Sequence, residues 1–251
     1  MTQPASSRDV FDDLEAEDER LEAIFASLDD DSWASPSDAP GWSIVDVVLH
    51  LAQTDEAVVQ AVAGTAAREL WASPGAATLD AVMDRAVRAQ SAPAHVVFDR
   101  WREARRAAAV ALRQADPARA VAWVAAPIAP RTLATTRLAE HWAHGLDITG
   151  PLSVSFPDTD RLRHVAWLGH RSLPYALSLV GEAPHAVFCE LSGPGGDTWT
   201  FGPLDADSAI RGSAGEFCRV GAQRLTPGAS NLKTEGPHGA IALRALRNYA
   251  A

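Results

Sequence analysis

Cysteine and long apolar runs are scarce in this sequence of 251 residues. Its two cysteines, Cys189 and Cys218, are far apart and have no metal-binding spacing, which argues against a disulfide framework. No apolar run approaches the roughly 20 residues that a membrane-spanning helix needs. The first residues are acidic and hold no apolar segment of the kind found in signal peptides. We therefore expect a cytoplasmic protein that does not enter a membrane.

Positive charge is also in short supply. Acidic residues outnumber basic ones by 32 to 22, the formal net charge is −10, and Lys233 is the only lysine. Nucleic-acid binding needs a basic patch, and the densest basic run, residues 100–106, is interrupted by Glu103. We therefore expect no nucleic-acid partner. The sequence does not distinguish a monomer from a homodimer.

The first half of the chain has helical periodicity. Ser43 with Asp46 fits a capping box at the start of one helix, and Gly64 fits its end. Helices of this number and length are typical of a bundle. The predicted helices span residues 10–28, 43–64, 79–90, 94–114 and 131–150.

The second half mixes helices and strands. A helix is expected over residues 158–180, with a bend at Pro174. Strands are expected at 185–193 and 197–204, around a turn rich in Gly and Pro, and a third at 208–211. The remaining predicted helices span residues 214–224 and 238–249. This is an α+β pattern, with one domain over residues 1–152 and a second over 153–251.

One helical segment, TTRLAEHWAHGLDI, concentrates polar side chains. Glu140 and His144 lie one turn apart on one helix face, the spacing with which two side chains chelate one cation. A solvated helix face accounts for the pair equally well. His141 with His144 is a competing pair. Asp147 suits either an acceptor for a ligand imidazole or an ordinary residue at a helix end.

A third metal ligand is expected from His50. Its helix is apolar nearly all round, so a histidine there needs a hydrogen-bond or metal partner. Facing helices of a bundle can bring such side chains to one core site. Two histidines and a carboxylate suit a divalent metal with open positions, although a satisfied core histidine is the alternative.

Two motifs carry a resemblance to a known family. GWSIVDVVLHLAQTD and RLAEHWAHGLDI resemble the paired motifs of the DinB-like metal-binding superfamily, and more closely those of the mycothiol-dependent maleylpyruvate isomerase family of actinobacteria. The resemblance implies a DinB-like four-helix bundle in which His50, Glu140 and His144 hold a divalent metal, zinc or nickel. SAIRGSAGEFCRVGAQR resembles a helix of the family's second domain, a sterol-carrier-protein-like α+β unit.

The end of the chain departs from that family pattern. SNLKTEGPHGAIALRALRNYAA stands where a more apolar helix containing tryptophan is expected. This departure leaves open how the second domain closes and whether it contacts a substrate.

The resemblance also implies a chemistry. It implies that the thiol cofactor mycothiol acts at the metal, because a metal lowers the pKa of a thiol. It also implies a small electrophilic substrate, which undergoes a transfer or an isomerisation. An arginine of the second domain would hold a substrate carboxylate. Arg224 matches best by motif position, and Arg211 and Arg219 are further candidates, although each also suits a surface position. Cys189 and Cys218 have apolar neighbours and suit the core better than a nucleophilic role.

Two other functions fit the same residues. The metal could act as a Lewis acid without a thiol, for hydrolysis, cyclisation or isomerisation. The chain could also bind a metal or small molecule without catalysis, because no general base is evident near the motif. Trp42, Trp101 and Trp142 fit either a substrate pocket or the core.

Overall fold

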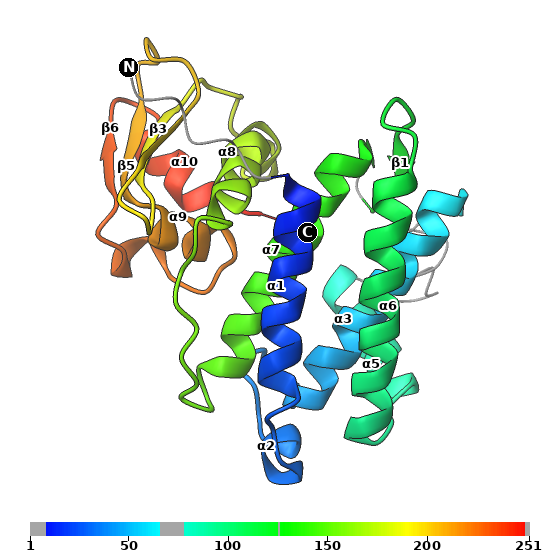
Figure 1. Ribbon diagram of the computed structural model, residues 1–251. Coiled ribbons are helices and arrows are strands. Elements are labelled where there is room, and N and C mark those ends of the chain that lie inside the picture. The colour runs from blue at the N-terminus through cyan, green and yellow to red at the C-terminus, as the bar shows by residue number, and fades with distance from the viewer. Residues whose placement is uncertain (1–8, 66–77, 125, 249–251) are drawn as a thin grey trace. The chain divides into compact units, whose positions relative to one another are not determined.

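The computed structural model describes residues 9–65, 78–124 and 126–248 (Figure 1). The chain forms two compact units, which divide in sequence between Phe156 and Pro157. Tyr249, the end of the last predicted helix, lies outside the described residues. Among the described residues, none of the helices has both the length and the apolar character that crossing a membrane requires.

Four long helices pack against one another in the first unit, which we call the helical unit (Figure 1). They are α1 (Val10–Phe25), α3 (Ile44–Ala63), α6 (Ala94–Gln114) and α7 (Pro130–Thr149). The most extensive contacts join α3 with α6 and α1 with α7, and α7 also packs against α3. The two helices predicted to carry the metal ligands are therefore neighbours.

Short elements fill the connections of the helical unit. They are α2 (Asp30–Ala34), α5 (Leu79–Ala89) and an antiparallel pair of strands, β1 (Val121–Ala122) and β2 (Pro127–Ile128). The prediction of one helix over residues 10–28 was wrong at its end: α1 ends at Phe25, and α2 follows as a separate helix. The Asp29 side chain caps α2 by accepting from the Ser32 N–H, and a capping residue starts a new helix.

The predicted end signals of α3 are confirmed. The Ser43 N–H donates to the Asp46 carboxylate over 2.9 Å, which completes the capping box. Gly64 ends the helix with φ +113°, in the left-handed region that glycine adopts without strain. These local signals fix where α3 begins and ends, and so which turn carries His50.

Several aromatic side chains pack together in the core of the helical unit. Trp101 is fully buried, with its ring 4.9 Å from that of Phe25, and Trp142 is also buried. Both belong to the core, which was one of the two positions that the sequence allowed. Trp42 is half-buried, and its ring lies 5.1 Å from that of His50. Trp42 thus lies beside a predicted ligand.

The second unit contains a four-stranded sheet in the order β4-β3-β5-β6. Its strands are β3 (Phe188–Ser192), β4 (Thr198–Phe201), β5 (Ala209–Ser213) and β6 (Lys233–Glu235). β3 pairs antiparallel with β4 and parallel with β5, and β5 pairs antiparallel with β6. The first three strands lie where the sequence predicted them. β6 was missed because it is short, polar and at a sheet edge, so its sequence carries no apolar alternation.

Helices complete the second unit, and the whole chain is an α+β protein. α8 (Leu162–Leu179) is one helix that continues through Pro174. α9 (Ala214–Gly221) packs on α8, the 3₁₀ turn η1 (Pro227–Ala229) follows, and α10 (Gly239–Ala245) comes last. The last helix was predicted too long. It ends at Ala245, and Leu246 adopts a non-helical conformation.

The end of the described chain closes the second unit through Asn248. Its backbone N–H donates to the Gly221 carbonyl over 2.8 Å, and its side-chain amide donates to the Cys218 carbonyl over 3.3 Å. A Cβ at Gly221 would lie 2.3 Å from the Asn248 Oδ1 atom, and one at Gly169 would lie 2.7 Å from it. Closure therefore uses a buried asparagine against two glycines instead of a tryptophan-containing helix.

Candidate metal centre

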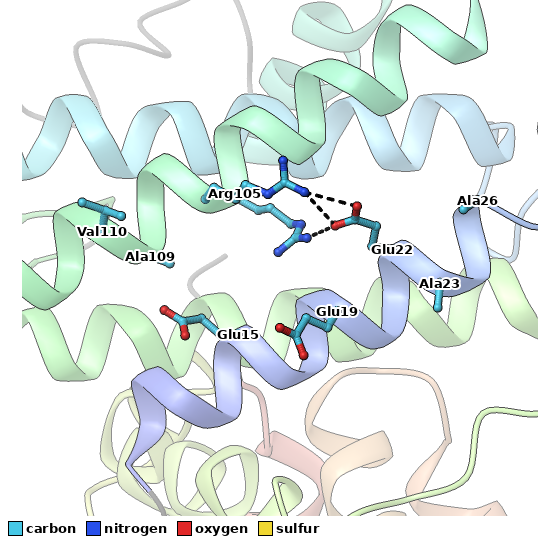
Figure 2. Close-up of a pocket in the computed structure, with 9 residues that line it drawn as sticks. Glu15, Glu19, Glu22, Ala23, Ala26, Arg105, Ala109 and Val110 are labelled. Atoms are coloured by element: carbon cyan, nitrogen blue, oxygen red, sulfur yellow. Dashed lines mark hydrogen bonds and ion pairs between the residues drawn. The ribbon is translucent and has the colours of Figure 1, made fainter.

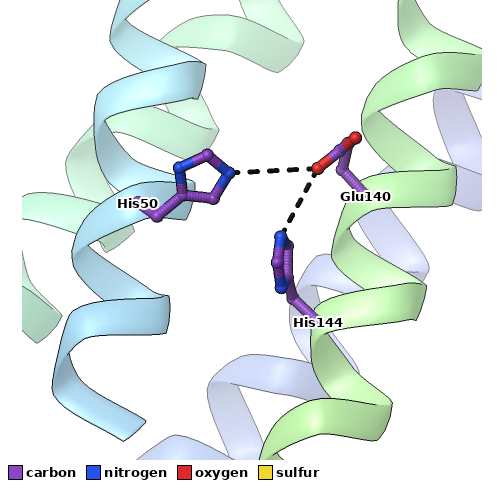
Figure 3. A group of neighbouring side chains, drawn as sticks. All are labelled: His50, Glu140 and His144. Atoms are coloured by element: carbon purple, nitrogen blue, oxygen red, sulfur yellow. Dashed lines mark ion pairs between the residues drawn. The ribbon is translucent and has the colours of Figure 1, made fainter. Parts of the chain in front are cut away.

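The structure brings together His50, Glu140 and His144, which we call the triad (Figure 3). His50 comes from α3, and the other two come from successive turns of α7. Glu140 Oε2 lies 4.0 Å from His50 Nε2 and 3.5 Å from His144 Nε2. One donor atom from each residue lies within 4.8 Å of the other two. Among the described residues, the triad is the group of this kind that could hold a metal ion.

The solvated-face alternative for α7 is wrong. His141, His144 and Asp147 are all buried, because α7 contacts α1, α3 and α6. Within the triad, the side chains of His50 and His144 are 9% and 11% exposed, whereas that of Glu140 is 29% exposed. The triad is therefore accessible to solvent mainly at Glu140.

The donor atoms of the triad match the needs of a small divalent cation. Nitrogen and oxygen ligands lie about 2.0–2.1 Å from zinc, so tetrahedral ligands lie about 3.3 Å from one another. The separations from Glu140 Oε2 to His144 Nε2 and His50 Nε2, 3.5 and 4.0 Å, are somewhat longer than this value.

Burial and neighbouring charges shift the pKa values of the triad. Burial, together with the charge of His144, lowers the pKa of His50 to about 3, so its imidazole is neutral at neutral pH. Burial opposes a charge on Glu140, but hydrogen bonding and attraction to His144, followed by Arg137, hold the pKa of Glu140 well below its usual range. A neutral imidazole and an ionised carboxylate are the forms that bind a metal.

Asp147 orients one histidine of the triad. His144 Nδ1 lies 2.9 Å from Asp147 Oδ2, and Asp147 is 1% exposed. Burial disfavours a charge on His144, but the bonds to Asp147 and Glu140 outweigh burial and raise its pKa. Donation from Nδ1–H to a carboxylate is the usual support of a metal-binding histidine, because it leaves Nε2 to bind a cation once Nε2 has lost its proton.

His141 does not compete for the same cation. Its Nδ1 contacts Asp18 at short range, and its Nε2 lies 3.1 Å from Asp55 Oδ2. Burial disfavours a charge on His141, but the Asp55 and Asp18 carboxylates outweigh burial and raise its pKa to about 9. Both ring nitrogens are therefore engaged with carboxylates, which leaves none for a metal.

Sequence reasoning missed Asp18 and Asp55, although a signal was present. On α1, Asp18 lies between Leu14 and Leu21 in the spacing of the apolar face. On α3, Asp55 follows Leu51 by four residues, again on the buried side. An acidic residue at an apolar position of a helix requires a buried partner, and each of these two finds His141.

The second unit holds the remaining predicted residues. Arg219 makes a two-bond ion pair with Asp158, at 2.7 and 2.9 Å. Arg211 lies 2.8 Å from Glu190 and also contacts Glu235. The Arg224 Nη1 atom donates to the Ala222 carbonyl over 2.7 Å.

Both cysteines are buried free thiols of the second unit. Burial raises the pKa of Cys189 to about 12 and also raises that of Cys218. Nucleophilic attack and metal binding both require the thiolate, so neither side chain suits these roles.

A groove of about 690 Å³ runs between α1 and α6, separate from the triad (Figure 2). Glu15, Glu19 and Glu22 line one wall, and Arg105 and Arg106 line the other. Glu22 forms ion pairs with both arginines, which join the two walls. No residue of the triad lines the groove, and we assign it no part in the site.

Related proteins are similar in sequence to the helical unit or to most of the chain. The family model described as the mycothiol maleylpyruvate isomerase N-terminal domain matches residues 14–149, which include the triad. Two proteins of Mycobacterium tuberculosis, from strains CDC 1551 / Oshkosh and H37Rv, are each 40% identical to this chain over 216 residues. The match covers 84% of this chain and 84% of each relative, and both relatives are described as uncharacterized.

Solved structures with the same fold have low sequence identity. The crystal structure of the mycothiol-dependent maleylpyruvate isomerase has a TM-score of 0.61 at 14% identity and covers 91% of this chain and 95% of that chain. A histidine-to-alanine mutant of that isomerase has a TM-score of 0.60 at 13% identity, over the same shares. At this identity, the similarity shows that the helix-rich α+β fold is shared.

Proposed function

Because this chain belongs to the family of the mycothiol maleylpyruvate isomerase N-terminal domain, we propose that it is a metal-dependent enzyme that uses a thiol cofactor of the mycothiol type. It acts on a small electrophilic substrate in a transfer or an isomerisation. The observation that carries the proposal is the convergence of the triad from two helices. In this proposal the helical unit is a DinB-like four-helix bundle, and the second unit is a sterol-carrier-protein-like domain.

In this proposal the triad holds a divalent cation, zinc or nickel. His50 and His144 each offer Nε2, Glu140 offers a carboxylate oxygen, and Asp147 keeps the His144 ring in place. When bound, such a cation supplies a Lewis acid that lowers the pKa of a thiol or water. Three protein ligands leave a position for an external group, which reaches the triad on the exposed side of Glu140.

The buried cysteines support an external thiol. Burial raises the pKa of Cys189 to about 12, and Cys218 is fully buried. If the reaction uses a thiol, that thiol has to come from a cofactor, because neither protein thiol ionises near neutral pH. This agrees with the activity named for the isomerase of the same fold, which is mycothiol-dependent.

Arg224 is proposed to hold a carboxylate of the substrate. A guanidinium binds a carboxylate through paired hydrogen bonds. Arg219 and Arg211, which form ion pairs with carboxylates of the second unit, are the further candidates. The role of Arg224 rests on its motif position.

Metal analysis tests the proposal directly. Plasma mass spectrometry on untagged protein is expected to find about one equivalent of zinc or nickel in the wild type and none in His50→Ala or His144→Ala. His95→Ala, an exposed histidine of α6, is the matched control and keeps the metal. A wild type that stays metal-free after incubation with zinc would contradict the metal site.

Thiol dependence needs a second measurement. Calorimetry is expected to detect mycothiol binding to metal-loaded protein and not to protein treated with a chelator. Turnover of an electrophile that needs the metal and no thiol would instead favour Lewis-acid chemistry. Metal binding with neither thiol binding nor turnover would favour a non-catalytic metal-binding protein.

A further inference from the structure

Four buried charged side chains form a chain of contacts across the helical unit, which we call the charge chain. Asp18 on α1 contacts His141 on α7. His141 Nε2 lies 3.1 Å from Asp55 Oδ2 on α3. Arg137 on α7 donates from Nε to Asp55 Oδ1 over 2.9 Å. Each of the four residues is at most 2% exposed.

The charge chain meets the triad along both ligand-bearing helices. On α7, Arg137 precedes Glu140 by three residues, and His141 directly follows Glu140. On α3, Asp55 follows His50 by five residues. Asp55 therefore binds two side chains of α7, one on each side of Glu140 in sequence. These bonds join the helix of His50 to the helix of Glu140 and His144.

A contribution to stability alone does not account for the charge chain. Burying charges costs solvation, and well-packed apolar side chains often stabilise a core as much or more. Apolar packing is non-directional, however, whereas hydrogen bonds fix one relative position of two helices. A slip of one residue along a helix is about 1.5 Å, which exceeds the roughly 0.5 Å tolerance of a preorganised site.

The triad depends on that relative position because its ligands are divided between the two helices. α3 supplies His50, and α7 supplies the other two ligands. The bond from Asp147 to His144 lies within α7 and cannot hold α3 in register. The Nδ1 atom of His50 has no hydrogen-bond partner among the described residues, so no such bond orients its ring. The placement of His50 therefore depends on the position of α3.

We propose that Asp55 is a positioning residue for the metal centre, which holds α3 in register with α7 so that His50 reaches the cation held by Glu140 and His144. This inference rests on the proposed metal site and concerns a residue that does not itself touch the cation. It predicts that the geometry of the site changes when Asp55 is altered, although all three ligands remain.

Cobalt(II) spectroscopy on the full chain tests the role of Asp55. Asp55→Asn keeps the size of the side chain and removes its charge. The variant is expected to bind cobalt about 10- to 100-fold more weakly, in competition with a chelator, and to show an altered ligand-field spectrum. Asp18→Asn is the matched control, because Asp18 is equally buried and contacts the same His141 but lies on α1. It is expected to lower the melting temperature and to keep the wild-type spectrum.

A second variant covers the case in which Asp55→Asn does not fold. The double change Asp55→Asn with Arg137→Gln removes both charges of one pair and leaves no buried guanidinium without its carboxylate. It is expected to show the same altered spectrum and weaker binding.

The outcomes separate this inference from the metal proposal. A wild-type spectrum and affinity in the Asp55 variants would overturn the positioning role, and so would equal spectral changes in the Asp18 and Asp55 variants. If the wild type itself takes up no cobalt or zinc, the metal site is wrong, and the positioning role is overturned with it.

Discussion

The helical unit buries charged side chains, whereas the second unit keeps its charged side chains at least partly exposed. Among the described residues, the buried polar side chains of the second unit are Ser208 and Asn248. The helical unit buries carboxylates, guanidinium groups and imidazoles, among them Asp55, Arg137 and His141. Arginines of the second unit do form ion pairs, but the Arg219 side chain retains 27% exposure.

This difference supports the proposal that the metal centre lies in the helical unit. Burying a charge costs free energy unless the charge is paired, so a core that serves only stability is usually apolar. The second unit follows this rule, with buried Phe217, Leu191 and two cysteines in its interior. The helical unit departs from the rule around the triad, where the pKa of His50 is lowered and that of the nearby His141 is raised; strongly shifted pKa values are common at functional sites.

The largest expected effect comes from removing one buried charge. Arg137→Met leaves Asp55 without one of its partners and should lower the free energy of unfolding by about 3–5 kcal/mol. Arg219→Met, in the half-exposed pair of the second unit, should cost about 1 kcal/mol or less. Chemical denaturation followed by circular dichroism measures both. Equal losses in the two variants would remove the contrast between the units.

A smaller effect is expected from the support of the triad. Asp147→Asn retains the shape of the side chain but weakens its acceptor, so metal affinity should fall about 10- to 100-fold while the fold remains. Competition with a chelator measures the affinity. Asp99→Asn, an exposed carboxylate of α6, is the control with unchanged affinity. Wild-type affinity in Asp147→Asn would make Asp147 an ordinary helix residue.

The buried amide of the second unit offers a test of packing without charge. Gly221→Ala places a Cβ 2.3 Å from Asn248 Oδ1 and should lower the free energy of unfolding by about 1–3 kcal/mol. Gly228→Ala, where a Cβ meets nothing within 4 Å, is the matched control. Adding Asn248→Ala should recover part of the loss, because it removes the crowded atom. A Gly221→Ala variant as stable as the wild type would show that the segment around Asn248 can shift to accommodate the added Cβ.

The smallest expected effect is that the two cysteine thiols do not react with a labelling reagent. The pKa of Cys189 is raised to about 12, so at pH 8 only about one thiol in 10⁴ is ionised. A thiol reagent should therefore label neither cysteine of the native protein within minutes and should label both in denaturant. Rapid labelling of native protein would show that the interior of the second unit opens, and it would weaken the argument for an external thiol.

Long periodic elements were predictable from the sequence, and short polar ones were not. Both ends of α3 were predicted correctly, because the capping box of Ser43 with Asp46 and the C-terminal Gly64 depend only on residues close by in sequence. β6 is a polar edge strand that exists because β5 offers it a hydrogen-bonding partner. The last helix was predicted over residues 238–249, but it ends at Ala245, and Asn248 beyond it donates to the Cys218 carbonyl of α9.

The candidate site, like the fold, was predictable from the sequence only in part. Spacing along the chain placed Glu140 and His144 on one face, because residues four apart on a helix share a face, and the resemblance to the family then favoured this pair over His141 with His144. The sequence also indicated that His50 needed a partner, since its helix is apolar nearly all round. The tertiary structure alone decided that His141 contacts Asp18 and Asp55 instead of a metal, and that Asp55 binds the helix of the other ligands. Those contacts join residues 82 to 123 positions apart, and no local pattern encodes which distant carboxylate packing brings to a buried imidazole.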